Sequence, residues 1–161
     1  MIKNNFIIIS LIFISFSQTA FNQDYASVLE QKWIGGSNSR TDLTESGYFV
    51  CKETLYEISY DEYSNTFTGK SLASFDYNGS VYEYNCYIKG KVNTDDNSVV
   101  IDATSTISSD DLPDGLYWTH PTLNLVIYED DDHSGEYVMI GQSSAQYYDD
   151  EYVAYGTYAY Y

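Results

Sequence analysis

Basic residues are scarce in this chain of 161 residues, which carries seven lysines and arginines against 24 aspartates and glutamates, a formal net charge of −17. Nucleic acids and anionic membrane surfaces attract basic proteins, so this charge disfavours both as partners. Helical periodicity longer than a single turn is missing, which excludes a helical domain. The chain also lacks G-x-S-x-G, H-E-x-x-H and paired-cysteine metal motifs, so no catalysis is inferred from motifs.

The first twenty residues have the pattern of a secretory signal peptide. Lys3 supplies a short positive region, Phe6–Phe16 is an apolar stretch, and small residues follow at Ser17 and Ala20. The apolar stretch is too short to span a bilayer as a helix. We therefore expect residues 1–20 to be removed and residues 21–161 to form one domain of a secreted or periplasmic protein.

Period-two alternation of apolar and polar residues runs through most of the remaining chain and predicts strands joined by short turns. Tyrosine, with 19 copies, suits strands because its polar tip tolerates half-buried positions. An arm or short helical turn is expected over Phe21–Leu29. The expected strands are Gln31–Gly35, Val50–Tyr60, Thr66–Tyr77, Ser80–Val92, Ser98–Ile107, Tyr117–Tyr128, Glu136–Ala145 and Glu151–Tyr160.

Asn78-Gly79 is the strongest turn signal in the chain, because a type I′ turn needs positive φ at both central residues. Folding the chain there puts five pairs on one face of a hairpin and the polar residues on the other, so register and burial agree. The five pairs are Phe75–Tyr82, Ala73–Tyr84, Ser71–Cys86, Gly69–Ile88 and Phe67–Gly90. Such strands in succession predict an all-β fold, an antiparallel up-and-down meander of about eight strands closing into a barrel, with a β-sandwich as the alternative.

The order of signal peptide, early Trp33, strands containing x-G-x-S and a tyrosine-rich meander resembles small secreted lipocalin-like (calycin-type) barrels. Lipocalins usually place a glycine two residues before this tryptophan, where the chain has Gln31, and a late arginine that no residue after Arg40 supplies. The resemblance implies the barrel fold and binding of small molecules inside it.

Aromatic residues offer a candidate binding site for a small molecule or glycan, because an eight-stranded barrel is just wide enough either to be filled by its own side chains or to hold one small ligand. Aromatic residues on an inner face that only fill the core are the other interpretation. His120 precedes Pro121 at the start of an expected strand, close to Trp118 and near an expected end of the barrel. The candidate ligand-binding residues are Trp33, Tyr82, Tyr84, Tyr117, Trp118 and His120.

The acidic loop that begins at Asp130 reads D-x-D-x-S-G, which matches the first six positions of an EF-hand calcium loop. Candidate ligands are Asp130, Asp132, Ser134 and a backbone carbonyl of Glu136. The match ends there, since position 12 is Gly141 in place of a bidentate glutamate. Calcium is the one cofactor that the sequence suggests, and a solvated turn without metal is the other interpretation.

Cys51 and Cys86 are the chain's two cysteines, and an oxidising compartment favours a disulfide between them. If consecutive strands pair, however, a third strand separates the two. Bridging would then need a bent strand end to bring the Cβ atoms together. Both outcomes stay open.

Two other functions compete with a soluble binding module. The segment 147–161 contains seven tyrosines and ends on an aromatic residue, as the closing strand of an outer-membrane barrel does, and a membrane would then be the partner. A small hydrolase would need two carboxylates across a cleft, for which Glu53, Glu57 and Glu83 are candidates, although strand carboxylates usually face outward. The oligomeric state is not predicted.

Overall fold

A computed structural model describes residues 24–40, 48–133, 135–148, 151–154 and 156–161, with the side chains of 39–40, 48–49, 146–148 and 151–154 left out of the description. The expected signal peptide, residues 1–20, lies outside these ranges. Within them, no helix has the length and apolar character needed to cross a membrane.

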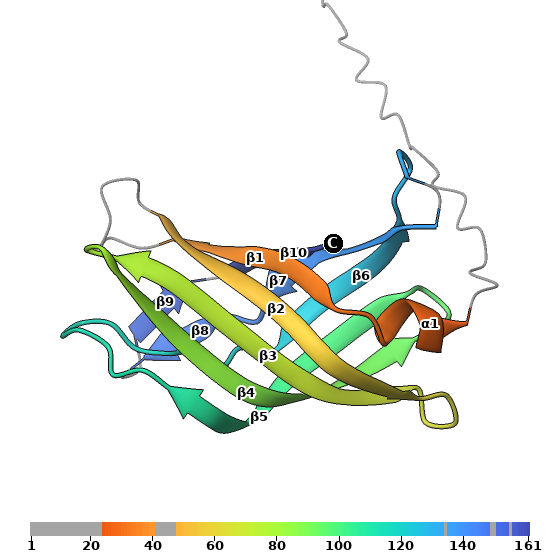
Figure 1. The fold of residues 1–161 in the computed structure, drawn as a ribbon, viewed down its shortest axis with the longest axis horizontal. Coiled ribbons are helices and arrows are strands. Elements are labelled where there is room, and N and C mark those ends of the chain that lie inside the picture. The colour runs from red at the N-terminus through yellow and green to blue at the C-terminus, as the bar shows by residue number, and fades with distance from the viewer. Residues whose placement is uncertain (1–23, 41–47, 134, 149–150, 155) are drawn as a thin grey trace, which may run out of the picture.

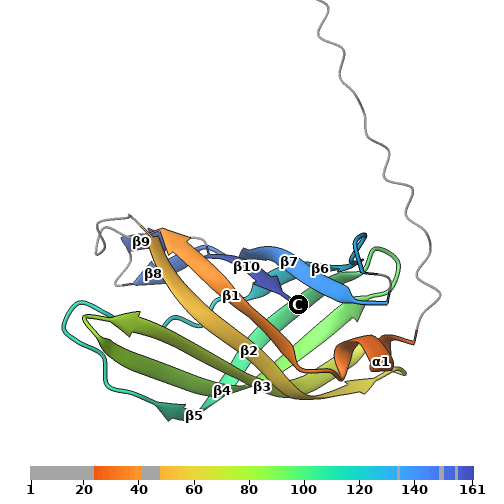
Figure 2. The same ribbon diagram turned by 45° about the horizontal axis from the view of Figure 1, so that its top comes forward.

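The fold is all-β, and eight antiparallel strands close into one up-and-down barrel, as the sequence predicts (Figures 1 and 2). The strand order around the barrel is β1-β10-β7-β6-β5-β4-β3-β2, and β8 pairs with β9 in a separate two-stranded sheet. The elements are α1 Tyr25–Leu29, β1 Trp33–Arg40, β2 Tyr48–Asp61, β3 Thr66–Tyr77, β4 Ser80–Asn93, β5 Ser98–Ser109, β6 Leu123–Glu129, β7 Tyr137–Ser143, β8 Gln146–Tyr148, β9 Glu151–Ala154 and β10 Gly156–Tyr160.

The hairpin of β3 and β4 has the predicted turn and register. Asn78 and Gly79 have φ of 53° and 79°, as a type I′ turn requires. All five predicted cross-strand pairs are present, from Phe75 opposite Tyr82 to Phe67 opposite Gly90. The ring of Phe67 lies against Gly90, and a Cβ at position 90 would fall 2.1 Å from the ring, so this position requires a glycine. At this pair the aromatic ring therefore occupies the space that a side chain at position 90 would need.

Three expected strands differ from the structure. The strand expected over Tyr117–Tyr128 begins only at Leu123, because the segment before it, which contains Pro121, forms a loop at one end of the barrel. The strand expected over Glu151–Tyr160 is divided into β9 and β10, of which only β10 joins the barrel. The first strand continues past Gly35 to Arg40, because β2 and β10 pair with it on both sides.

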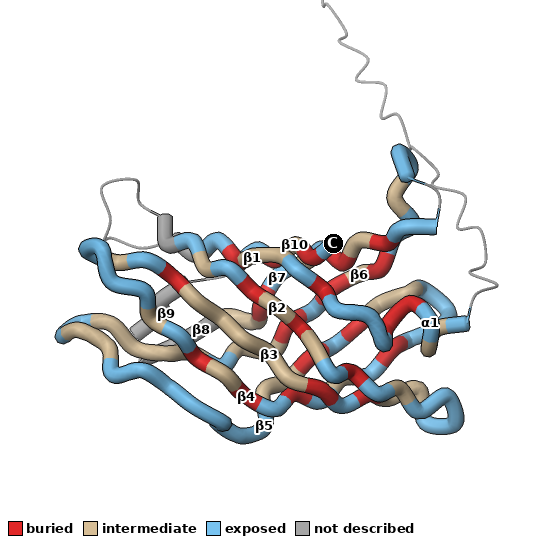
Figure 3. The backbone as a smooth tube through the Cα atoms, viewed as in Figure 1, coloured by how far each residue is buried: buried red, intermediate tan, exposed pale blue. Residues whose placement is uncertain are grey.

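Helix α1 covers one end of the barrel, and the sheet of β8 and β9 lies at the other end (Figures 1 and 2). Buried and exposed positions alternate along the strands, so the apolar side chains point inward (Figure 3). Asp24 caps the helix by accepting a hydrogen bond from the backbone of Ala26 at 3.1 Å. Val28 and Leu29 are 2% and 0% exposed and seal this end.

Trp33 is the largest fully buried side chain, and it joins α1 to the core. Its indole Nε1 donates to the carbonyl of Leu29 at 3.2 Å, which satisfies the one polar atom of the ring. The carboxylate of Glu30 accepts from the backbone of Tyr60 at 2.8 Å and links the end of the helix to β2. The α1 end is thus a packed plug rather than an entrance.

Candidate functional site

A row of inward-facing residues crosses six strands of the barrel and contains one acid. Residues that pair directly across antiparallel strands point to the same face of the sheet. Gly35 and Ala73 are the cross-strand partners of Glu53 on its two sides. The complete row is Met139, Tyr160, Gly35, Glu53, Ala73 and Tyr84. Glu53 therefore has a small residue on either side, with a tyrosine beyond each.

Glu53 is a buried acid, only 9% exposed, and the hydroxyl of Ser37 donates to its Oε1 at 3.1 Å. Burial raises the pKa of this carboxyl from 4.5 to about 7, and the hydrogen bond from Ser37 offsets part of that rise. Near pH 7 the site therefore holds a carboxyl that gains or loses its proton readily.

No basic side chain that the structure describes neutralises Glu53. Lys32, Lys52, Lys89 and Lys91 are exposed. Lys70 lies over the rings of Tyr56 and Tyr87 and pairs with Glu57. Ionised Glu53 is thus an uncompensated buried charge, which is costly in an apolar interior.

Four further titratable groups surround Glu53 inside the barrel. Burial raises the pKa of the Cys51 thiol to about 11, with the charge of Glu53 adding to the rise. The same two causes, burial first, raise the pKa values of Cys86, Tyr158 and Tyr160. All four are therefore neutral near pH 7. The residues Ser37, Cys51, Glu53, Cys86, Tyr158 and Tyr160 are called the interior polar cluster below.

Tyr160 has the one buried side-chain polar atom without a hydrogen-bond partner among the described residues, its hydroxyl. The residue is 0% exposed, and the charge of Glu53 acts on it. An unsatisfied buried hydroxyl costs about 1–3 kcal/mol. Because β10 and β4 lie four places apart in the ring of eight strands, the interior polar cluster spans opposite walls of the barrel.

Aromatic side chains gather at the end of the barrel remote from α1. Trp118 contacts Phe75 and Tyr84, with ring centroids 5.2 and 5.4 Å apart. Tyr82 stacks on Phe75 at 5.5 Å, and His120 lies 4.7 Å from Tyr84. These five residues are called the aromatic cluster below. The structure thus brings together Tyr82, Tyr84, Trp118 and His120, four of the candidates for ligand binding.

Two members of the aromatic cluster combine exposure with a polar group. His120 is exposed, yet partial burial of its ring lowers its pKa, so the ring is neutral near pH 7. Trp118 is half-buried, and its Nε1 donates to the carbonyl of Asp110 at 3.3 Å. The cluster therefore presents aromatic surface where the loop before β6 meets the hairpin of β3 and β4.

The two remaining ligand candidates, Trp33 and Tyr117, do not belong to the aromatic cluster. Trp33 is 0% exposed in the plug at the α1 end, so a ligand at the aromatic cluster does not reach it. Tyr117 is half-buried in the loop next to Trp118.

Cys51 and Cys86 are both free thiols in the structure. Their strands β2 and β4 are separated by β3, which is the arrangement that the order of strands predicts. Both thiols belong to the interior polar cluster and add to its weakly polar lining.

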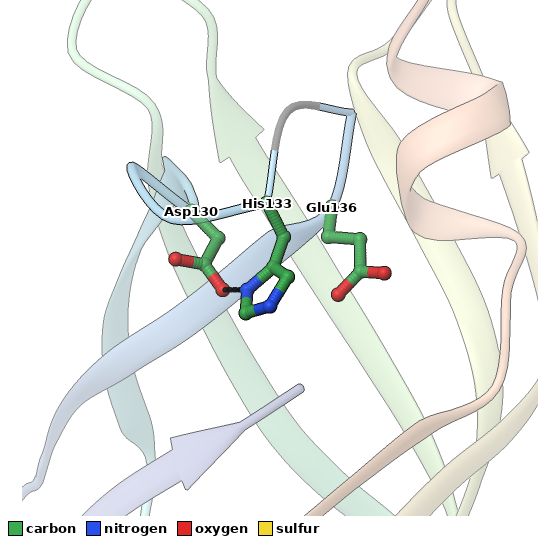
Figure 4. A group of neighbouring side chains, drawn as sticks. All are labelled: Asp130, His133 and Glu136. Atoms are coloured by element: carbon green, nitrogen blue, oxygen red, sulfur yellow. Dashed lines mark hydrogen bonds and ion pairs between the residues drawn. The ribbon is translucent and has the colours of Figure 1, made fainter.

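The acidic loop between β6 and β7 brings together a different set of ligands from the predicted one (Figure 4). Ligand atoms of Asp130, His133 and Glu136 lie within 4.8 Å of one another. The Nδ1 of His133 bonds to Asp130 at 3.0 Å, which lowers the pKa of the aspartate and raises that of the histidine. Asp132 is not in this group, and Ser134 lies outside the described residues. Calcium binding stays a prediction.

The carboxylates proposed for a hydrolase do not converge. Glu57 and Glu83 are exposed on the outside of the barrel, whereas Glu53 is inside. The expectation that strand carboxylates face outward is therefore wrong for Glu53. The signal was present in the alternation of Cys51, Glu53 and Leu55, which places the acid on the apolar face.

A groove of about 580 Å³ lies along β1, β10 and β7 and is lined mostly by outward-facing residues. Small residues line it, among them Gly36 and Ala159, together with the larger apolar side chains of Val50 and Ile140. The groove offers mainly apolar contact and no cluster of charged groups.

The chain matches no protein-family model, and comparison with curated proteins and with solved structures likewise finds no match.

Proposed function

We propose that this protein is a secreted or periplasmic binding module that holds one small molecule inside its barrel. The polar group of the ligand lies at the interior polar cluster, and its body extends toward the aromatic cluster. The resemblance to lipocalin-like barrels supports this reading through the closed eight-stranded fold, which is the architecture those proteins use for small ligands. Calcium and catalysis play no part in the proposal.

The observation that carries the proposal is a pair of buried polar groups in the barrel interior, an acid without a counter-charge and a hydroxyl without a hydrogen-bond partner among the described residues. An uncompensated carboxyl at Glu53 and an unpartnered hydroxyl at Tyr160 both cost stability. Apolar residues of similar size would remove that cost. Perturbed titratable groups of this kind gather at functional sites, where a ligand supplies the missing partners.

The direction of the apolar face favours a soluble barrel over an outer-membrane barrel. A membrane barrel turns an apolar band outward and keeps its interior polar. Here the inward positions carry residues such as Leu55, Ile88 and Leu125, whereas Lys52 and Lys89 are exposed on the outside. Because the inside of an eight-stranded barrel is at most wide enough for one small ligand, a small molecule also fits better than an extended glycan.

Filling the barrel interior tests this function. The neutral dye N-phenylnaphthylamine fluoresces in apolar surroundings, and we expect it to bind the purified protein saturably at one site. Ala73→Phe puts a ring between Glu53 and Tyr84 and should abolish binding. Ser74→Phe, the next residue on the outer face, is the matched control and should leave binding unchanged. Unsaturable binding, or equal binding by both variants, would contradict the proposal.

A further inference from the structure

We propose that the ligand is an organic cation, a protonated amine on a small aromatic or apolar body, whose ammonium group pairs with Glu53. This inference rests on the proposed function and specifies the chemical class of its ligand. Three features of the interior carry it: an uncompensated acid, unused hydrogen-bond acceptor capacity at and beside that acid, and an aromatic surface at a matching distance.

The first feature is charge. Glu53 is 9% exposed and has no cation beside it among the described side chains, since the four exposed lysines lie outside the barrel and Lys70 pairs with Glu57. A bound ammonium group would supply the missing counter-charge in the low-dielectric interior, where a charge-assisted hydrogen bond is strong. A carboxylate ligand would instead add a second negative charge.

The second feature is the inventory of donors and acceptors. An ammonium group carries three donors and no acceptor. Glu53 keeps acceptor capacity after accepting from Ser37, and the Tyr160 hydroxyl has a lone pair that no described residue uses. The remaining members of the interior polar cluster, Cys51, Cys86 and Tyr158, are neutral near pH 7, so they repel no cation, and each has lone pairs that can also accept.

The third feature is the distance between Glu53 and the aromatic cluster. Tyr84 lies in the same inward row as Glu53, with only Ala73 between them. Two strand spacings correspond to about 10 Å, which is the length of a small arylalkylamine. The rings of Tyr84 and Trp118 then offer stacking surface for the body of the ligand. The net charge of −17 also attracts cations to the protein as a whole.

Three probes of nearly equal shape and different charge test the inference: phenethylamine, phenylethanol and phenylacetate. Calorimetric titration at pH 8 should give the order amine, then alcohol, then carboxylate. Glu53→Gln should weaken phenethylamine by about tenfold or more and leave phenylethanol nearly unchanged, because only the charged pair is lost. Glu83→Gln removes an exposed strand carboxylate and is the matched control, with the affinity of the wild type.

The dependence on pH gives a second test that needs no variant. An amine with a pKa of about 10 stays protonated from pH 5.5 to 8.5. The affinity for phenethylamine should therefore rise as Glu53 ionises, while the affinity for phenylethanol stays constant. The other titratable groups facing Glu53 are the two thiols and two tyrosines of the interior polar cluster. They remain neutral throughout this pH range. Phenylethanol binding as tightly as phenethylamine would overturn the charge inference alone. Binding of none of the three probes, together with no dye binding, would overturn the proposed function itself.

Discussion

Replacing Glu53 by glutamine should stabilise the protein at neutral pH and leave it unchanged in acid. The pKa of Glu53 is raised from 4.5 to about 7 in the folded protein, mainly by burial. The folded state therefore binds more protons than the unfolded state between these values, and the free energy of unfolding falls as the pH rises through this interval. Below pH 4.5 both states are protonated and the penalty is absent.

The magnitude follows from the two pKa values. The folded and unfolded pKa values of Glu53 differ by about 2.5, and each pKa unit corresponds to about 1.36 kcal/mol. Above pH 7 the free energy of unfolding of the wild type is therefore lowered by about 3 kcal/mol. Glutamine keeps the acceptor for Ser37 and carries no charge, so Glu53→Gln avoids this loss. For a domain of this size, that difference amounts to about 10 °C in Tm at pH 8.

Urea unfolding at intervals from pH 4 to pH 8.5 measures the effect. The quantity to plot is the stability of Glu53→Gln minus that of the wild type, because the other carboxylates cancel in this difference. It should rise from near zero in acid to about 3 kcal/mol at pH 8. Glu83→Gln, an exposed strand position, should give a flat line near zero. A flat line for Glu53→Gln as well would refute the assignment of a buried, uncompensated acid.

Two further predictions concern the plug and the thiols. Trp33→Ala should lower the free energy of unfolding in urea by about 3–5 kcal/mol, because it leaves a cavity at a fully buried position, whereas Trp118→Ala, half-buried, should cost less. Cys51 and Cys86 should react slowly with Ellman's reagent in the native protein, because burial raises their pKa values, and should titrate as two thiols after unfolding without reductant. No thiol in the unfolded, unreduced protein would instead indicate a disulfide.

Local sequence signals predicted the fold because each acts over a few residues. Asn78-Gly79 specified both the turn and the register of β3 and β4, since a slip by one residue would have moved Phe67 and Phe75 to the outside. The same signals failed where neighbouring strands decide the outcome. The segment before Leu123 alternates as a strand does, yet no strand within the described residues pairs with it. Its residues Trp118 and His120 pack as part of a loop against Tyr84 instead.

The candidate site was only partly predictable. Aromatic residue type was enough to select Tyr84, Trp118 and His120, which the structure brings together. It was not enough to separate them from Trp33, because a tryptophan in the core and one at a binding surface have the same local pattern. Only the position of α1 over one end of the barrel makes that distinction.

Local sequence patterns were enough to predict the class of fold, because period-two alternation and turn chemistry depend on neighbouring residues and leave little choice beyond an antiparallel meander. Tertiary structure alone decided the chemistry of the interior. Closure of the barrel brings Tyr160 and Glu53, more than a hundred residues apart in the chain, into one inward row through Gly35. Closure also removes Glu53 from water and from every described lysine, and that desolvation is what raises its pKa. Charge and burial at such a position depend on the opposite wall of the barrel, which no short window of sequence contains.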